Sequence, residues 1–131
     1  MPLTKLPDNL TTIGTYAFYQ CRAMTIKEVP SGVTQISNYA FYNCIALTEL
    51  TIKGNITSIG NNAFNASSLL AKIVLPNVTS VPTISSNSLS GTPIAKGTGY
   101  IYVSDSLIDS FKSATNWSLY ADQIKGISEL E

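Results

Sequence analysis

The residues that could do chemistry are few in this chain. Its 131 residues contain two cysteines, Cys21 and Cys44, and no histidine. Zinc sites usually need three or four protein ligands, mostly Cys and His, and Cys-His or Ser-His nucleophile pairs need an imidazole base. We therefore expect no metal site, no cofactor and no enzymatic activity.

The two cysteines occupy the same position in two successive units of a repeat described below. Equivalent residues of stacked repeats lie about 4.8 Å apart, within the Cα separation that a disulfide permits. Parallel side chains are nevertheless poorly aimed for a disulfide torsion. The sequence favours two stacked free thiols, with a disulfide or a metal-binding pair as alternatives.

Other candidate motifs have a structural explanation. The segment at 97–99 reads Gly-Thr-Gly but lacks the Lys-Ser/Thr of a phosphate loop, so it predicts a plain turn. Asp105 and Asp109 can stabilise a helix start and have no partner base nearby in sequence. Asn-x-Ser/Thr triplets are formal glycan acceptors, but a chain rich in these residues produces them by chance. They begin at Asn9, Asn55, Asn65, Asn77 and Asn116.

The charge balance and the lack of a long apolar run argue against nucleic-acid binding and membrane insertion. Eight Lys and Arg residues balance eight Asp and Glu residues, and charged residues make up only 12% of the chain. Nucleic-acid binding is not expected, because phosphate attraction requires an excess of cations. No apolar run is long enough for a signal peptide or a membrane span, so direct membrane insertion is not expected either.

The ending Leu130-Glu131 and the early start of the repeat suggest a piece of a longer protein.

A short repeat occupies the first part of the chain. The units 10–32 and 33–55 align without a gap and share nine identical positions, and 56–77 continues the pattern in a slightly shorter unit. One such unit cannot bury its apolar face alone, whereas stacked units bury it against their neighbours. We therefore expect stacked coils joined by a continuous parallel ladder.

Each position of the repeat has a regular character. Phe18, Phe41 and Phe64 follow an alanine, and we expect them to enter the interior from a short helical turn and to form one buried ladder. Further on, apolar residues alternate as in a strand, which ends at Pro30, Gly54 and Pro76-Asn77. Lys27 replaces an apolar residue, so we expect a register shift there or a side chain that reaches solvent. Apolar pairs bracketing polar residues predict a very short strand or a corner turn at Leu10/Ile13, Val33/Ile36, Ile56/Ile59 and Val78/Val81.

The pattern of Ile, Gly or Ser, two polar residues, Ala-Phe, three residues, Cys or Ser, and a Leu-led strand resembles the BspA-like leucine-rich repeats of bacterial cell-surface proteins. The resemblance implies an α/β repeat fold, a right-handed solenoid with a parallel sheet on one side and short helical or irregular segments on the other. It also implies a cell-surface or secreted location and a role in adhesion or protein binding. It carries over no catalytic residues.

The repeat becomes degenerate in residues 78–103 and ends in a tail. Residues 100–103 predict a strand in the last place of the ladder. Ser104-Asp105 predicts the start of a helix at about 106–114, and Asn116 that of a second short helix with Gly126 as its stop. The expected organisation is a leucine-rich-repeat solenoid over 1–103 and a C-terminal helical cap over 104–131.

Two faces of the solenoid are candidates for binding. Tyr16, Tyr19, Tyr39 and Tyr42 flank the Ala-Phe pairs, and exposed tyrosines are enriched in protein and glycan contacts. The alternative is that these rings only pack on the next coil. The outward strand positions Glu28, Thr51 and Val74 are expected to form a solvated face. We expect a protein or glycan ligand at the tyrosines; the rival is a structural stalk, cap or virion-type appendage with no external ligand.

Overall fold

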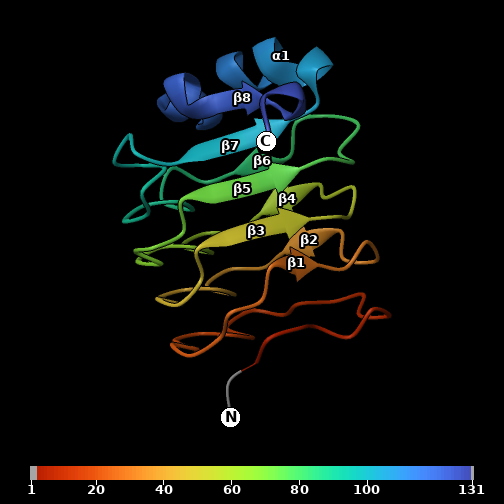
Figure 1. Cartoon of the computed structure of the whole chain (residues 1–131), viewed down its shortest axis with the longest axis vertical. Helices are drawn as coiled ribbons and strands as arrows, with labels where there is room; N and C mark the ends of the chain where they lie inside the picture. The colour runs from red at the N-terminus through yellow and green to blue at the C-terminus, as the bar shows by residue number, and fades with distance from the viewer. Residues whose placement is uncertain (1–2, 131) are drawn as a thin grey trace.

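The computed structural model describes residues 3–130, which form a column of stacked coils (Figure 1). Met1, Pro2 and Glu131, at the ends of the predicted solenoid and cap, lie outside the described residues. The strands make two parallel sheets, with the orders β1-β3-β5-β7-β8 and β2-β4-β6. The predicted repeat architecture with a parallel sheet is confirmed, whereas a right-handed superhelical path stays a prediction.

The five-stranded sheet contains the alternating segments of the repeat. Its strands are β1 (Glu28–Val29), β3 (Glu49–Ile52), β5 (Lys72–Leu75), β7 (Tyr100–Val103) and β8 (Ile124–Gly126). Leu50 pairs with Ile73 and Ile73 with Ile101, and all three side chains are buried. The first three strands end before Pro30, Gly54 and Pro76, as the sequence predicts. Lys27 is exposed, while the register of the repeat is kept at Glu28 and Thr51.

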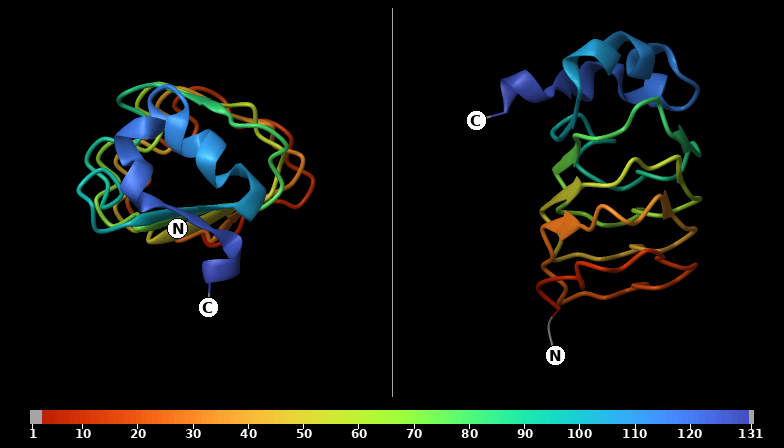
Figure 2. Two further views of the ribbon diagram at one scale, coloured as in Figure 1. Left: turned by 90° about the horizontal axis from the view of Figure 1, so that it is seen from above. Right: turned by 90° about the vertical axis from the view of Figure 1, so that its right-hand side faces the viewer.

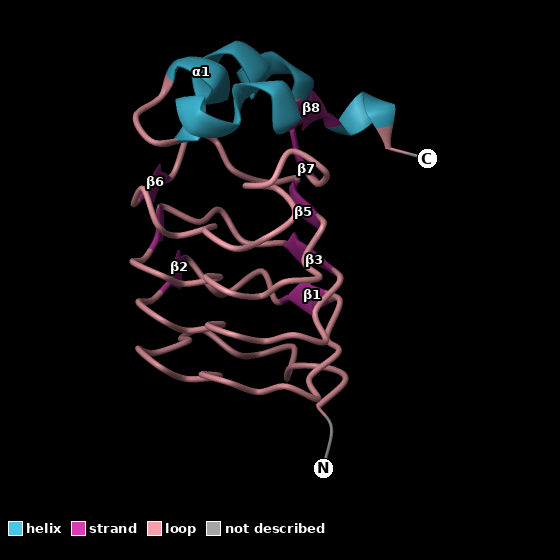
Figure 3. Ribbon diagram, turned by 90° about the vertical axis from the view of Figure 1, so that its left-hand side faces the viewer, coloured by secondary structure: helices cyan, strands magenta, loops and turns pink. Residues whose placement is uncertain are grey.

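The three-stranded sheet forms the opposite wall of the column (Figure 3). Its strands are β2 (Gln35–Ile36), β4 (Ser58–Ile59) and β6 (Thr83–Ile84). β2 and β4 correspond to the apolar pairs Val33/Ile36 and Ile56/Ile59, for which the sequence predicts a very short strand or a corner, whereas β6 lies just beyond the predicted pair Val78/Val81. Ile13 extends the ladder to the first coil through an isolated bridge to Ile36.

The fourth coil is more regular than predicted. Ile59 pairs with Ile84 and not with Val81, so three residues are inserted before β6 and the pattern then resumes. The backbone N–H of Phe64 donates to the carbonyl oxygen of Ser88, which places Leu89 where the earlier coils have phenylalanine. Leu89 is fully buried. This coil is not recognisable from the sequence pattern, because the insertion shifts its register and a Ser-Leu pair stands at the Ala-Phe position.

The Ala-Phe segments are turns that contain left-handed residues. They are not the short helical turns that the sequence predicts. Tyr16, Tyr39 and Asn62 precede the Ala-Phe pairs with positive φ, between 57° and 63°. Along these turns some N–H groups donate three residues back, as Ala17 does to Gly14, and the others donate to the next coil, as Phe18 does to Ala40. Left-handed residues break a helix after one turn.

The phenylalanines form the predicted ladder. The ring centroids of Phe18 and Phe41 are 5.4 Å apart, and those of Phe41 and Phe64 are 5.3 Å apart, all stacked. Phe41 and Phe64 are fully buried, and Phe18 is half-buried because it lies in the first complete coil. The ladder is the centre of a core that runs along the whole column.

The tail, defined as residues 104–130, closes the upper end of the column (Figures 1 and 2). It contains η1 (Asp105–Leu107), α1 (Ile108–Ser113), η2 (Trp117–Gln123), β8 and η3 (Ile127–Glu129). The two predicted helical segments are present, but neither Ser104 nor Asn116 makes a side-chain cap.

One prediction about the tail is wrong. β7 does not hold the last place of the ladder, because β8 pairs with it in parallel and Gly126 lies in that strand. Ile124 at its start is buried beside Ile101, at a position that the sequence places in the second short helix between Asn116 and Gly126. The division into a solenoid of 1–103 and a cap of 104–131 stays a prediction.

The start of the chain also belongs to the stack. The N–H of Thr25 donates to the carbonyl oxygen of Leu3, and Leu6 is buried. Leu3 and Leu6 precede Ile26 and Val29 by one period of the repeat, so the first described segment fills the strand side of a coil before the first complete one. The repeat that the sequence predicts starts at Leu10 and does not include this segment.

Candidate interaction surfaces

The turns of the first two coils place four tyrosines on the outside of the column. Phe18 packs against the core, and Tyr16 and Tyr19 flank the Ala17-Phe18 pair with exposed side chains. The second coil repeats this arrangement with Tyr39 and Tyr42. These four residues are called the tyrosine cluster below.

The rings of the tyrosine cluster form two stacked columns that touch each other. Tyr16 and Tyr39 are stacked with centroids 4.9 Å apart, and Tyr19 and Tyr42 with centroids 5.0 Å apart. Within each coil the rings meet at an angle, 69° for Tyr16 and Tyr19 and 54° for Tyr39 and Tyr42. The structure thus brings all four sequence-predicted residues together.

Exposure differs between the two coils. Tyr16 is 53% exposed and Tyr19 is 40% exposed, whereas Tyr39 and Tyr42 are half-buried. The third coil continues the columns with Asn62 and Asn65, whose side chains are hydrogen-bonded to each other at 2.7 Å. The ring faces therefore cover one another along each column, and the first coil is the more open end.

A second group of aromatic residues, not predicted from the sequence as a candidate site, lies on the five-stranded sheet. Tyr100 and Tyr102 alternate along β7, and Lys125 and Lys72 lie over their rings at 5.5 Å and 5.9 Å from the centroids. The alternation of tyrosines with aliphatic residues in 100–103 is the sequence signal that could have indicated this group. Val74, expected to be solvated, is only 7% exposed beside Tyr102.

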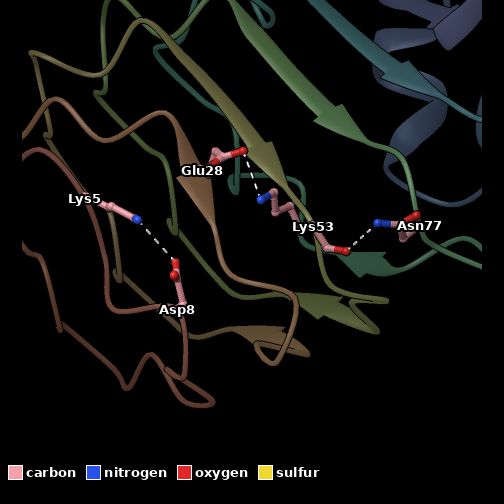
Figure 4. Close-up of polar contacts among 5 residues, drawn as sticks. All are labelled: Lys5, Asp8, Glu28, Lys53 and Asn77. Atoms are coloured by element: carbon pink, nitrogen blue, oxygen red, sulfur yellow. Dashed lines mark hydrogen bonds and ion pairs between the residues drawn. The ribbon is translucent and has the colours of Figure 1, made fainter.

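Two ion pairs lie on this side of the molecule. Lys53 lies 3.1 Å from the carboxylate of Glu28, and the Asn77 amide donates to the Lys53 carbonyl oxygen at 2.8 Å (Figure 4). Lys5 and Asp8 make a second, exposed pair. A shallow cleft of about 190 Å³ lies between these charges. Its lining residues are Thr4, Lys5, Leu6, Asp8, Lys27, Glu28, Pro30 and Lys53.

An apolar groove lies at the end of the three-stranded sheet, where β6 meets the tail. Its volume is about 310 Å³. The lining residues are Val81, Pro82, Thr83, Ile84, Ala114, Thr115 and Trp117.

The two cysteines are free thiols, as the sequence favours. The Cys44 thiol is buried and donates to the carbonyl oxygen of Phe18, with 3.1 Å between sulfur and oxygen. Ser67, at the same position of the next coil, donates to the Phe41 carbonyl oxygen at 2.7 Å in the same way. Burial raises the pKa of the Cys44 thiol to about 12, so this sulfur is not a nucleophile at neutral pH. Within residues 3–130, no three metal-ligating side chains are grouped.

Four of the five candidate glycan acceptors use their side-chain amides in the fold. The amide nitrogens of Asn55, Asn65, Asn77 and Asn116 each donate a hydrogen bond. Asn9 is exposed. These hydrogen bonds support a structural role for the four asparagines.

Coils that stack in register and bury one another's apolar faces define a repeat protein. A family model described as a BspA type leucine rich repeat region matches residues 2–116 in six copies. The chain therefore belongs to the BspA-type leucine-rich repeat family. Comparison with curated proteins and with solved structures gave no significant match. Among residues 3–130, no helix has the length and apolar character needed to cross a bilayer.

Proposed function

We propose that this chain is a non-catalytic interaction module of a cell-surface or secreted protein, with a contact surface for a protein or glycan at the tyrosine cluster. The observation that carries the proposal is the set of four contacting rings on the outer turns of two coils, two of them 40% or more exposed. Membership of the BspA-type family supports an interaction role, and adhesion is the form of it that the family resemblance suggests.

The tyrosine cluster can bind a partner at a low cost in side-chain entropy. Each tyrosine has only two side-chain torsions, and stacking on a neighbour already restricts them, so little further ordering is needed when a partner binds. The residues next to the rings along the turns are uncharged; they are Thr15, Gln20, Asn38 and Asn43. Because four side chains form only a small contact area, we expect modest affinity for a partner.

The test compares the wild-type chain with the double variant Tyr19→Ser/Tyr42→Ser, which removes one of the two ring columns. Both are screened on arrays of extracellular-matrix proteins and of glycans. Leu119→Ser is the matched control, because Leu119 is 62% exposed on the tail. We expect the wild type and the control to bind the same ligand and the double variant to lose at least about tenfold in affinity.

Two results would contradict the proposal. Unchanged binding by a folded double variant would remove the tyrosine cluster as the contact surface. Binding of no ligand by the wild type would favour the rival reading, in which the coils serve only as a structural stalk or cap.

A further inference from the structure

Charge is unevenly distributed along this chain, although its net charge is zero. The segment 50–104, which contains the third and fourth coils, has three lysines and no Asp or Glu; the lysines are Lys53, Lys72 and Lys96. The carboxylates lie before it, up to Glu49, and after it, from Asp105 onward. The middle of the column therefore carries a local excess of positive charge.

Two lysines of the five-stranded sheet lie over aromatic rings. Lys72 in β5 and Lys125 in β8 stand on either side of β7. The ammonium nitrogen of Lys72 lies 5.9 Å from the ring centroid of Tyr102, and that of Lys125 lies 5.5 Å from the ring centroid of Tyr100. We call these four residues the lysine–tyrosine patch.

Neither lysine of the patch is neutralised by a carboxylate within residues 3–130. The ion pairs of the described chain involve Lys5 and Lys53, and not these two lysines. Glu49 is the cross-strand neighbour of Lys72 but forms no ion pair with it. Glu129 and Asp105 each accept a backbone N–H of the tail, at 3.0 and 3.2 Å. The two ammonium groups therefore remain available to an anionic ligand.

The patch lies on the side of the column and not at one of its ends (Figure 1). β5, β7 and β8 are the last three strands of the sheet, so coils placed before the first one would extend the sheet beyond β1 and leave the patch uncovered. Tyr100 is 38% exposed, and Lys72, Tyr102 and Lys125 are half-buried. Contact with the rings restricts the lysine side chains before a partner binds, which lowers the entropy cost of binding.

We propose that the lysine–tyrosine patch is a second interaction surface and that it binds an acidic segment of a partner protein. Carboxylates of the segment pair with Lys72 and Lys125 on the two sides of β7, and an apolar side chain between them contacts the rings of Tyr100 and Tyr102. This goes beyond the proposed function, because the patch lies on the five-stranded sheet and shares no residue with the tyrosine cluster.

Charge complementarity selects an anionic partner, and the ring geometry favours a polypeptide over an anionic glycan. The rings of Tyr100 and Tyr102 are tilted by 53° with centroids 6.4 Å apart, and each has an ammonium group over it. They therefore form no single open platform on which a sugar ring could stack. A polypeptide can instead place an apolar side chain beside its carboxylates. The two lysines lie two strand spacings apart, about 10 Å, within reach of acidic residues a few positions apart in an extended segment.

The probe is a synthetic peptide of repeated Glu-Glu-Leu units, and the control peptide has Gln-Gln-Leu units and the same length. Each is titrated into the isotope-labelled chain and followed by NMR at the signals of the four patch residues. Lys72→Gln/Lys125→Gln removes both cations of the patch. Lys5→Gln/Lys112→Gln is the matched control, because it makes the same change of charge at two exposed lysines elsewhere. Lys72→Arg/Lys125→Arg keeps both positive charges.

We expect saturable shifts at the patch with the Glu-Glu-Leu peptide only, and weaker binding as salt is added. Affinity should fall by about tenfold in Lys72→Gln/Lys125→Gln. It should stay unchanged in Lys5→Gln/Lys112→Gln and be retained in Lys72→Arg/Lys125→Arg. Tyr19→Ser/Tyr42→Ser should bind the peptide like the wild type, so failure of the proposed function at the tyrosine cluster is distinguishable from failure of this inference.

Four results would overturn the inference. The first is the absence of saturable shifts with the Glu-Glu-Leu peptide at millimolar concentration. The second is an equal loss of affinity in Lys72→Gln/Lys125→Gln and Lys5→Gln/Lys112→Gln, which would show attraction without a defined site. Tighter binding of a heparin-derived tetrasaccharide at the same residues would assign the patch to a glycan. Salt-sensitive self-association that Lys72→Gln/Lys125→Gln abolishes would assign it to a second copy of this chain.

Discussion

The indole nitrogen of Trp117 donates a hydrogen bond to the carbonyl oxygen of Pro82, with 2.6 Å between nitrogen and oxygen. In the coils below, the equivalent carbonyls of Thr34 and Thr57 accept backbone N–H groups from the next coil. The amide of Asn116 likewise donates to the carbonyl oxygen of Ile84, at 2.8 Å. Two tail side chains therefore replace the backbone donors that a further coil would supply, which explains how the three-stranded sheet ends with these two acceptors satisfied.

Trp117→Phe tests this replacement. The variant keeps an aromatic ring against Phe111, now 4.9 Å from the indole, but it leaves the Pro82 carbonyl without its donor. We expect the free energy of unfolding to fall by about 1–3 kcal/mol, the cost of an unsatisfied buried acceptor. Urea denaturation measures it, with Leu119→Ala as the exposed control. An unchanged midpoint would show that the indole hydrogen bond does not stabilise the end of the sheet.

The phenylalanine ladder predicts a gradient of mutational cost. Phe41 is stacked on both sides, so Phe41→Ala should cost about 3–5 kcal/mol. Phe18 is stacked on one side only and is half-buried, so Phe18→Ala should cost less. Thermal or urea unfolding of the two variants measures the two losses of stability. Equal losses, or a Phe41→Ala protein that melts like wild type, would contradict the assigned register.

Cys44 predicts a loss of stability at high pH. Its pKa rises from 9.0 to about 12 on folding because burial disfavours the thiolate. Between these values the unfolded chain has released the proton and the folded chain has kept it, so stability falls by about 1.4 kcal/mol per pH unit as pH rises above 9. Below pH 9 this contribution is fully present.

Cys44→Ser is the matched variant, because Ser67 occupies the same place in the next coil and makes the same contact. The difference in unfolding free energy between wild type and variant should shrink or reverse from pH 9 to pH 11, while tyrosine and lysine titrations cancel in the comparison. A difference independent of pH would show that the Cys44 thiol is not shielded from water.

Removal of the tail tests its role in protecting the sheet. A chain truncated after residue 103 loses β8 and exposes the edge of β7, together with the apolar surface covered by Phe111 and Trp117. We expect aggregation or edge-to-edge association, measured by light scattering and sedimentation. A soluble monomer with an unchanged melting curve would show that the tail is dispensable.

The sequence was most informative where the same residues recur. Three Ala-Phe pairs at constant spacing were enough to predict the ladder of Phe18, Phe41 and Phe64. The fourth coil was obscured because three inserted residues move Ile84 out of the expected position and a Ser-Leu pair replaces Ala-Phe. A helical turn was predicted at each pair because the spacing of the apolar residues does not reveal a positive φ at Tyr16 or Tyr39.

The candidate site was partly predictable for the same reason. The repeat period brings Tyr16 over Tyr39 and Tyr19 over Tyr42, so the two columns follow from the register alone. The unequal exposure of the tyrosines in the two coils does not follow from the register, because it depends on which residues lie against the first coil. Strand β8 was missed because three residues ending in glycine carry too little periodicity to indicate a strand.

The tyrosine cluster is proposed to serve contact with a partner and not to be needed for packing. The most direct measurement is the free energy of unfolding of Tyr19→Ser/Tyr42→Ser, determined beside Phe41→Ala under the same conditions. We predict a loss of about 1 kcal/mol for the double variant, the worth of one stacked aromatic pair, well below the loss for Phe41→Ala. A loss as large as that of Phe41→Ala would make the tyrosines part of the structural core and contradict the claim.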